Sequence, residues 1–212
     1  MLLGLDFDNT LISYDRLFHQ IALEREWIPA DVAIEKVAVR NHLRAIGRED
    51  DWTLLQGIVY GSRILEAEPY DGMVDTLAQL RMSGVPMRIV SHKTRTPYLG
   101  EPCDLHAAAR SWLTQQGFHR EDGLGWREDQ VFFELTKQDK AARIDALGCT
   151  HYVDDLPEIL EMLPAHMTRI LFAPNGAQEV PADWVVMQSW DQLPGLLGVT
   201  HRDALLSPTS LS

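Results

Sequence analysis

Few residues in this sequence can form cross-links or bind soft metals. It contains two cysteines, Cys103 and Cys149, and neither has a second cysteine or a histidine at the spacing of a zinc site. Two cysteines in 212 residues also do not make a disulfide framework. We therefore expect both side chains to be ordinary thiols.

Basic residues and long apolar segments are also scarce. Lys and Arg total 19 against 31 for Asp and Glu, which argues against a sequence-independent grip on nucleic acid or on an anionic membrane. No apolar run approaches the length of a membrane span, and the opening run has no basic leader and is too short for a signal peptide. We expect a soluble, cytoplasmic protein that binds neither nucleic acid nor membrane.

The apolar residues that are present, 45% of the chain, follow strand and helix patterns in alternation. Short apolar runs predict strands at 2–7, 87–90, 131–133, 152–153, 169–173 and 184–187. Helical patterns lie at 73–83, 104–116, 136–147, 156–163 and 190–197. Helical crossovers between strands require a parallel sheet with helices on both faces. The predicted fold class is therefore α/β, with a Rossmann-like parallel sheet.

A segment of purely helical pattern interrupts this alternation after the first strand. Its apolar stripes lie at 17–22, at 32–46 after a start signal at 29–31, and at 52–59. These stripes predict a small all-helical module at 13–68, inserted into a core made of 1–12 and 69–199. The Ser- and Thr-rich end, 200–212, is predicted to be a flexible tail.

The first predicted strand stops at two aspartates, Asp6 and Asp8, in the string DFDNTL. Alternate side chains of an extended chain share a face, so both carboxylates can point at one spot beyond the carboxyl end of the strand. Open α/β sheets bind their ligands at such ends.

Polar residues also mark the ends of other predicted elements. Ser91 ends the second strand, Thr136 and Lys137 begin a helix after the third, and Asp154 with Asp155 ends the fourth. The carboxyl ends of parallel strands lie on one edge of a sheet. We therefore expect these residues to converge with the two aspartates of the first strand.

With these elements in this order, the chain resembles the haloacid dehalogenase (HAD) superfamily of phosphohydrolases. The resemblance covers the core, roughly residues 2–174, and rests on DFDNTL, on the run into Ser91 of IVSHKT, on a lysine ahead of an apolar helix and on YVDDLPE. The inserted helices resemble a C1-type cap, which closes over small molecules and excludes water. The resemblance implies a Mg²⁺-dependent phosphomonoesterase, a hydrolase whose partner is a small phosphorylated metabolite.

The resemblance also implies a role for each acidic residue. Asp6 would be the nucleophile that forms an aspartyl phosphate, and Asp8 would protonate the leaving oxygen and then deprotonate water. Mg²⁺ would be bound by Asp6, by the backbone carbonyl of Asp8 and by Asp154. Asp155, or else Glu158, would support the metal.

Other residues would hold the phosphoryl group. The implied set is Asn9, Thr10, Ser91 and His92, together with one lysine. We favour Lys137 because the lysine of the family lies at a helix start. Lys140, one turn later, stays open as the alternative, although alone it is more typical of a solvated helix residue.

Specificity is expected to come from the cap and from the end of the second strand. The candidates that would contact the leaving group are Tyr14, Arg16, His19, Arg44, Tyr60, Arg63 and Lys93. A phosphomutase would keep the same catalytic residues and stays open, as does a catalytically silent binding module of this fold. The acid at Asp8 argues against the silent module, which needs no proton shuttle. The identity of the substrate and the oligomeric state also stay open.

Overall fold

A six-stranded parallel sheet forms the centre of the computed structural model, which describes residues 1–176 and 179–199. The predicted tail at 200–212 lies outside the described residues. The strand order is β5-β4-β1-β6-β7-β8. The strands are β1 (Leu3–Leu5), β4 (Met87–His92), β5 (Val131–Glu134), β6 (His151–Asp154), β7 (Thr168–Phe172) and β8 (Val185–Met187). The strand order reverses beside β1, which places a ligand-binding crevice at its carboxyl end.

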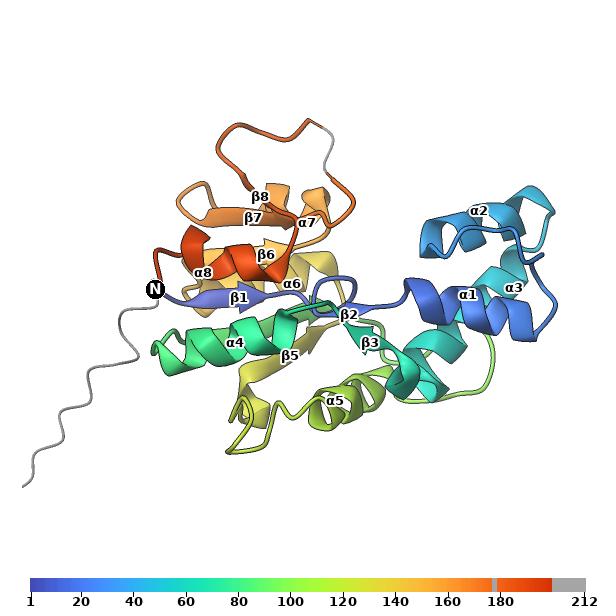
Figure 1. Cartoon of the computed structure of the whole chain (residues 1–212), viewed down its shortest axis with the longest axis horizontal. Coiled ribbons are helices and arrows are strands. Elements are labelled where there is room, and N and C mark those ends of the chain that lie inside the picture. The colour runs from blue at the N-terminus through green and yellow to red at the C-terminus, as the bar shows by residue number, and fades with distance from the viewer. Residues whose placement is uncertain (177–178, 200–212) are drawn as a thin grey trace, which may run out of the picture.

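Helices cover both faces of the sheet, as the α/β prediction requires (Figure 1). They are α4 (Met73–Met82), α5 (Leu105–Gln115), α6 (Lys137–Ala146), α7 (Pro157–Met162) and α8 (Leu193–Leu196). Buried side chains of α4, α5 and α8 join one apolar cluster, and those of α6 and α7 join a second. In β4, Ile89 belongs to the first cluster and Val90 to the second, because successive side chains of a strand point to opposite faces.

Two helix starts carry the side-chain caps that their sequences suggest. The carboxylate of Asp104 accepts hydrogen bonds from the amides of His106 and Ala107 at the start of α5. The hydroxyl of Thr136 accepts from the amide of Asp139 at the start of α6. Such caps satisfy backbone donors that the helix itself leaves free. The hydrogen bond of Thr136 fixes the start of α6, so Lys137 is the first residue of this helix.

Close packing at the centre of the sheet depends on Gly4 of β1. A Cβ atom at this position would lie 2.5 Å from Cδ2 of Tyr152, its neighbour on β6. The Tyr152 ring crosses β1, and its hydroxyl donates a hydrogen bond to the carbonyl of Val90 on β4. Glycine at position 4 therefore lets one side chain connect the two strands that flank β1.

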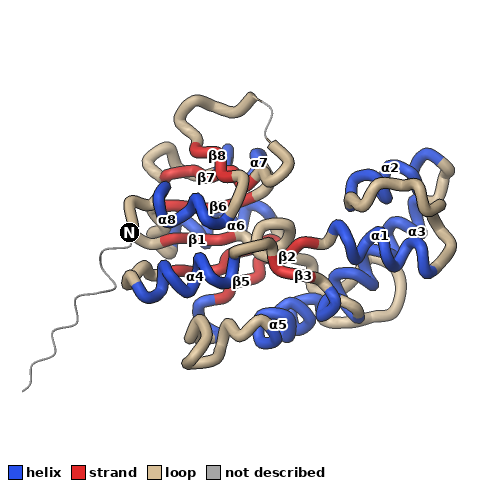
Figure 2. Tube along the Cα trace, in the orientation of Figure 1, coloured by secondary structure: helices blue, strands red, loops and turns tan. Residues whose placement is uncertain are grey.

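Five helical segments lie between two short antiparallel strands, β2 (Ile12–Ser13) and β3 (Glu68–Pro69). They are α1 (Asp15–Glu24), α2 (Lys36–Ala45), α3 (Glu49–Gly57), the π-helix η1 (Ile58–Ser62) and the 3₁₀-helix η2 (Ile64–Glu66). Figures 1 and 2 show α1, α2 and α3 beyond the end of the sheet toward which β1 points. We call the segment from β2 to β3 the cap. In the described part of the chain, no helix is both long and apolar enough to span a membrane.

The start predicted for the second cap helix is wrong. The helix begins at Lys36, so Val32 lies in the preceding loop, and Ile46 is 52% exposed rather than inward-facing. The carboxylate of Asp15 on α1 accepts a hydrogen bond from the Lys36 amide at 2.8 Å. Because the acceptor comes from another helix, the local start signal at 29–31 does not reveal it.

Gly4→Ala is expected to lower the free energy of unfolding by about 1–3 kcal/mol, because the added methyl group overlaps the Tyr152 ring. Gly195→Ala in α8 is the matched control, since an added Cβ there meets no atom within 4 Å. Chemical denaturation of the variants measures both effects. Equal free energies of unfolding for Gly4→Ala and the wild type would show that β1 and the Tyr152 ring can move apart without loss of stability, and would contradict the requirement for glycine.

Candidate active site

A cavity of about 220 Å³ is lined by residues at the carboxyl ends of β1 and β4 and by residues of the cap. The chain has only four lysines, and every one of them lines this cavity. They are Lys36 from α2, Lys93 after β4, and Lys137 and Lys140 from α6. Three carboxylates also line the cavity, Asp6, Asp8 and Asp155, and the buried Asp154 lies next to Asp6 and Asp155. Positive and negative side chains are therefore concentrated around the cavity between the sheet and the cap.

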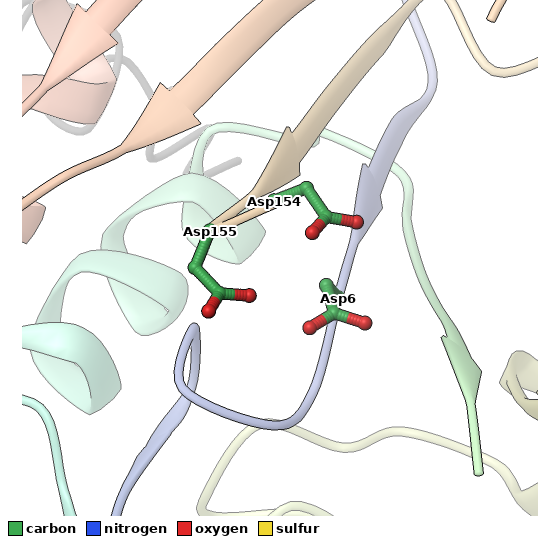
Figure 3. Close-up of side chains that lie close together, drawn as sticks. All are labelled: Asp6, Asp154 and Asp155. Carbon is green, nitrogen blue, oxygen red and sulfur yellow. The ribbon is translucent and has the colours of Figure 1, made fainter. Parts of the chain in front are cut away.

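Three of these carboxylates form a tight group. One oxygen each of Asp6, Asp154 and Asp155 lies within 4.8 Å of the other two, and Figure 3 shows the three side chains directed into one space. Asp6 and Asp154 are buried, whereas Asp155 is half-buried. The side chain of Asp8 is not in this group. The metal contact expected from the backbone carbonyl of Asp8 stays a prediction. Glu158 is exposed and pairs with Lys137 instead.

The electrostatics of this group favour a bound cation. Burial, and then the charge of Asp6, raise the pKa of Asp154 to about 7, although Lys140 opposes the rise. The same two causes, with the charge of Asp154 added, raise the pKa of Asp155 well above its ordinary value. Carboxylate oxygens are the donors that Mg²⁺ prefers, and a divalent ion offsets their mutual repulsion. The three acids therefore fit the predicted metal.

Lys140, rather than Lys137, reaches the aspartates. The Lys140 ammonium is buried and donates to Asp6 Oδ1 and to Asp154 Oδ2, at 2.6 Å each. Burial lowers its pKa, but these two carboxylates outweigh burial and raise it. The description of Lys140 as a solvated residue is therefore wrong, whereas the preference for Lys137 as the phosphate-binding lysine stays a prediction. Lys137 stands at the first position of α6, and the side chain of Lys140, one turn further on, reaches Asp6 after β1 and Asp154 at the end of β6.

Asp8 is held by two side chains that the sequence suggested for substrate recognition. The Tyr14 hydroxyl donates to Asp8 Oδ1 at 2.6 Å, and the Lys93 ammonium lies 2.9 Å from each Asp8 oxygen. Tyr14 and Lys93 are both buried, and burial followed by the charge of Asp8 raises the pKa of Tyr14. Both residues therefore orient Asp8, and Tyr14 does not line the cavity.

Ser91 and His92 both line the cavity, as the phosphate-binding prediction requires. The hydroxyl of Ser91 is buried and has no hydrogen-bond partner among the residues that the structure describes. A buried polar group without a partner costs about 1–3 kcal/mol, so an oxygen of a ligand would satisfy it. The Nε2 atom of His92 lies 3.1 Å from the carbonyl of Leu135, and burial lowers the His92 pKa.

Asn9 and Thr10 occupy different environments. Asn9 lines the cavity with a φ of 57°, in the left-handed region that asparagine tolerates better than most residues. Thr10 is buried behind the site: its hydroxyl lies 3.4 Å from Asp6 Oδ2 and its amide 3.4 Å from the Phe7 carbonyl. The structure therefore gives Thr10 a contact with the nucleophile candidate, while phosphate binding by either residue stays a prediction.

Tyr60 is the one cap residue among the specificity candidates that lines the cavity. The others have partners elsewhere: Arg16 with Glu68, His19 with the Val32 carbonyl, Arg44 with Glu49, and Arg63 with Glu24 and Glu66. Sequence reasoning missed Lys36, which reaches the cavity from the first position of α2. The scarcity of lysine in the chain was a signal that would have singled it out.

Comparisons with known proteins show the fold of the chain. No family model and no curated protein sequence matches it. Solved structures similar to it include a HAD family hydrolase from Deinococcus radiodurans R1 with bound phosphate and sodium (TM-score 0.56, 14% identity, 93% of this chain and 94% of that one). For the HAD-hydrolase YfnB from Bacillus subtilis bound to magnesium, the TM-score is 0.55 and the identity 13%, over 92% of this chain and 97% of that one. For a HAD phosphatase from Thermococcus onnurineus, the TM-score is 0.52 and the identity 17%, over 93% of this chain and 97% of that one. Another similar structure is of a dehalogenase. The chain therefore has the fold of the HAD-superfamily hydrolases.

Mg²⁺ is expected to stabilise the protein more strongly as the pH rises through about 7, the pKa of Asp154. Below that pH the metal-free protein keeps a proton on Asp154 that Mg²⁺ must displace, and above it the carboxylate is free to bind. Thermal unfolding with and without Mg²⁺, roughly one unit on either side of this pKa, measures the effect. Equal shifts at both pH values, or an undiminished shift in Asp154→Asn, would contradict the assignment.

Lys140→Met is expected to destabilise the metal-free protein by about 3–5 kcal/mol above neutral pH, since it leaves two buried carboxylates without their cation. The loss should shrink in acid, where those carboxylates take up protons. Lys137→Met, which breaks a partly exposed pair, should cost less than about 1 kcal/mol. Denaturant titrations compare the two variants, and similar losses would mean that Lys140 is not the cation on which the acids depend.

Proposed function

We propose that this protein is a Mg²⁺-dependent phosphatase that hydrolyses a small phosphomonoester through an aspartyl-phosphate intermediate on Asp6. A carboxylate oxygen of Asp6 attacks phosphorus as the bond from phosphorus to the leaving oxygen breaks. Asp8 gives its proton to that oxygen, and the alcohol departs. Asp8 then takes a proton from water, whose oxygen attacks phosphorus and breaks the bond to Asp6. Phosphate is released and both aspartates return to their starting states.

The position of Asp8 is the observation that favours phosphate ester hydrolysis over dehalogenation. A halide leaves carbon as a stable anion and needs no proton, whereas an alkoxide is a poor leaving group unless an acid protonates it. Asp8 lines the same cavity as Asp6, and three hydrogen bonds from Tyr14 and Lys93 hold its carboxylate. Such a second, firmly positioned carboxyl group, when it carries a proton, has a use in the first reaction and none in the second.

The remaining polar groups suit a phosphoryl group. The Ser91 hydroxyl would donate to a phosphoryl oxygen, and Lys140 holds Asp6 beside Asp154. Mg²⁺ held by Asp6, Asp154 and Asp155 would neutralise negative charge that otherwise repels the nucleophile. These groups stabilise charge where it develops during phosphoryl transfer.

The cavity favours a small substrate. Its volume of about 220 Å³ lies below the roughly 300–1,000 Å³ that is common for ligand pockets. The cap lies beyond the end of the sheet toward which β1 points (Figure 1), and its residues Lys36 and Tyr60 line the cavity. We therefore infer a phosphorylated metabolite, rather than a phosphorylated macromolecule, as the substrate.

Asp6→Asn is expected to abolish the release of phosphate, because the amide is a poor nucleophile. Asp8→Asn should lower kcat on alkyl phosphates by about 10²–10⁴ but act much less on aryl phosphates, whose leaving oxygen needs little protonation. Phosphate release from a panel of sugar, nucleotide and amino-acid phosphates and from an aryl phosphate, with Mg²⁺, measures these effects.

Full activity of Asp6→Asn would overturn covalent catalysis, and equal losses of Asp8→Asn on both ester types would overturn the acid role of Asp8. Absence of hydrolysis across the whole panel by the wild type would instead favour the silent binding module. Arg127→Gln is a suitable control, since Arg127 is exposed and pairs with Asp129 outside the cavity.

A further inference from the structure

Lys36 differs from the other lysines of the cavity in its ion pairing. Lys93 pairs with Asp8, Lys137 with Glu158, and Lys140 with both Asp6 and Asp154. Within residues 1–176 and 179–199, Lys36 has no carboxylate within 4.0 Å. It is therefore the cation of the cavity whose charge the described chain does not pair.

Aromatic rings of the cap fix the position of this ammonium. Its nitrogen lies 5.7 Å from the centroid of the Phe18 ring and 5.6 Å from that of Tyr60. Phe18 stacks on Trp52, and Tyr60 packs edge-on against Tyr14, so neither ring is free to move away. A cation over an aromatic face is stabilised without a counterion. The rings thus hold Lys36 at the cavity without pairing its charge with a carboxylate.

The surrounding charges keep Lys36 protonated. Burial lowers its pKa, but the neighbouring Tyr60 hydroxyl, followed by the charges of Asp8 and Asp155, outweighs burial and raises it. Asp8 is the carboxylate with the largest such effect. Lys36 and Asp8 line the same cavity, Lys36 from the cap and Asp8 from the core, so a substrate whose phosphoryl group lies at Asp6 would extend its leaving group toward the cap and Lys36.

The phosphoryl group itself has other partners in the core of the protein. Ser91 and Lys140, together with the metal-binding acids, lie at the carboxyl ends of the strands, whereas Lys36 comes from the cap. The phosphoryl group therefore does not need the positive charge of Lys36. This charge would instead complement a second negative charge elsewhere on the substrate.

We propose that Lys36 binds a second anionic group, a carboxylate or another phosphate, on the leaving group of the substrate. This inference rests on the proposed phosphatase function, and it narrows the substrate class to small phosphomonoesters of acidic alcohols. Tyr60 lines the wall beside this group, and its ring also lies 4.9 Å from the Lys93 nitrogen. The cap therefore selects by charge, and the core performs the reaction.

The test compares esters of equal carbon number that differ in charge. Phosphoglycolate supplies a carboxylate, ethylene glycol bisphosphate a second phosphate, and ethylene glycol monophosphate neither; the corresponding three-carbon set tests a longer reach. The measured quantity is kcat/KM for each charged ester divided by that for its neutral counterpart. A single charged hydrogen bond predicts a preference of about 10- to 100-fold in the wild type.

Lys36→Met is expected to remove this preference, mainly through KM, and Lys36→Arg to keep most of it. Arg44→Met is the matched control, because Arg44 is a cap cation that pairs with Glu49 and does not line the cavity. Its preference should equal that of the wild type. The carboxylate and bisphosphate arms separate the two possible sources of the anion.

A wild type that hydrolyses all the esters without preference for charge overturns this inference alone, as does a preference that survives in Lys36→Met. A wild type that hydrolyses none of the esters, nor an aryl phosphate, overturns the proposed function and this inference with it. Loss of the preference in Arg44→Met as well would attribute it to the overall charge of the cap and not to Lys36.

Discussion

The repulsion among three clustered carboxylates is the constraint on which the rest of the site depends. Asp6, Asp154 and Asp155 meet because β1 and β6 are adjacent parallel strands that end together. Burial and proximity raise the pKa values of Asp154 and Asp155, so the cluster needs positive charge. Lys140 supplies one cation from α6, and a divalent metal would supply more. The strand order, the start of α6 and the charge of the cavity all serve this arrangement.

A second arrangement surrounds Asp8. Lys93 from the end of β4 and Tyr14 from the start of the cap approach it from different parts of the chain. The cap thus contributes to the site itself, because Tyr14 orients Asp8, the proposed proton carrier. Lys36 enters from the same cap with its charge free for a ligand. Lys140 holds the proposed nucleophile, whereas Tyr60 links the proposed proton carrier to the recognition group, because its ring packs against Tyr14 and lies near the nitrogens of both Lys36 and Lys93.

Local patterns in the sequence predicted the sheet, its helices and the residues at the strand ends, because strand period and capping residues act over a few positions. The family resemblance favoured Lys137 over Lys140 because the family's lysine lies at a helix start, but which side chain of α6 reaches the aspartates depends on how the helix packs, and the structure places the Lys140 ammonium on Asp6 and Asp154. The local patterns misplaced the start of α2 because Asp15, on another helix, accepts the hydrogen bond of its first amide. Lys36 escaped notice for the same reason: its place is set by how the cap helices pack.

Trapping the covalent intermediate tests the central claim most directly. The enzyme is quenched with acid during turnover of an aryl phosphate, and its peptides are analysed by mass spectrometry. A peptide that contains Asp6 and has gained the mass of one phosphoryl group, localised to Asp6, is the predicted result. Rapid release of phosphate with the Asp6 peptide unmodified in every quenched sample, or with the phosphoryl group on another residue, would contradict the account.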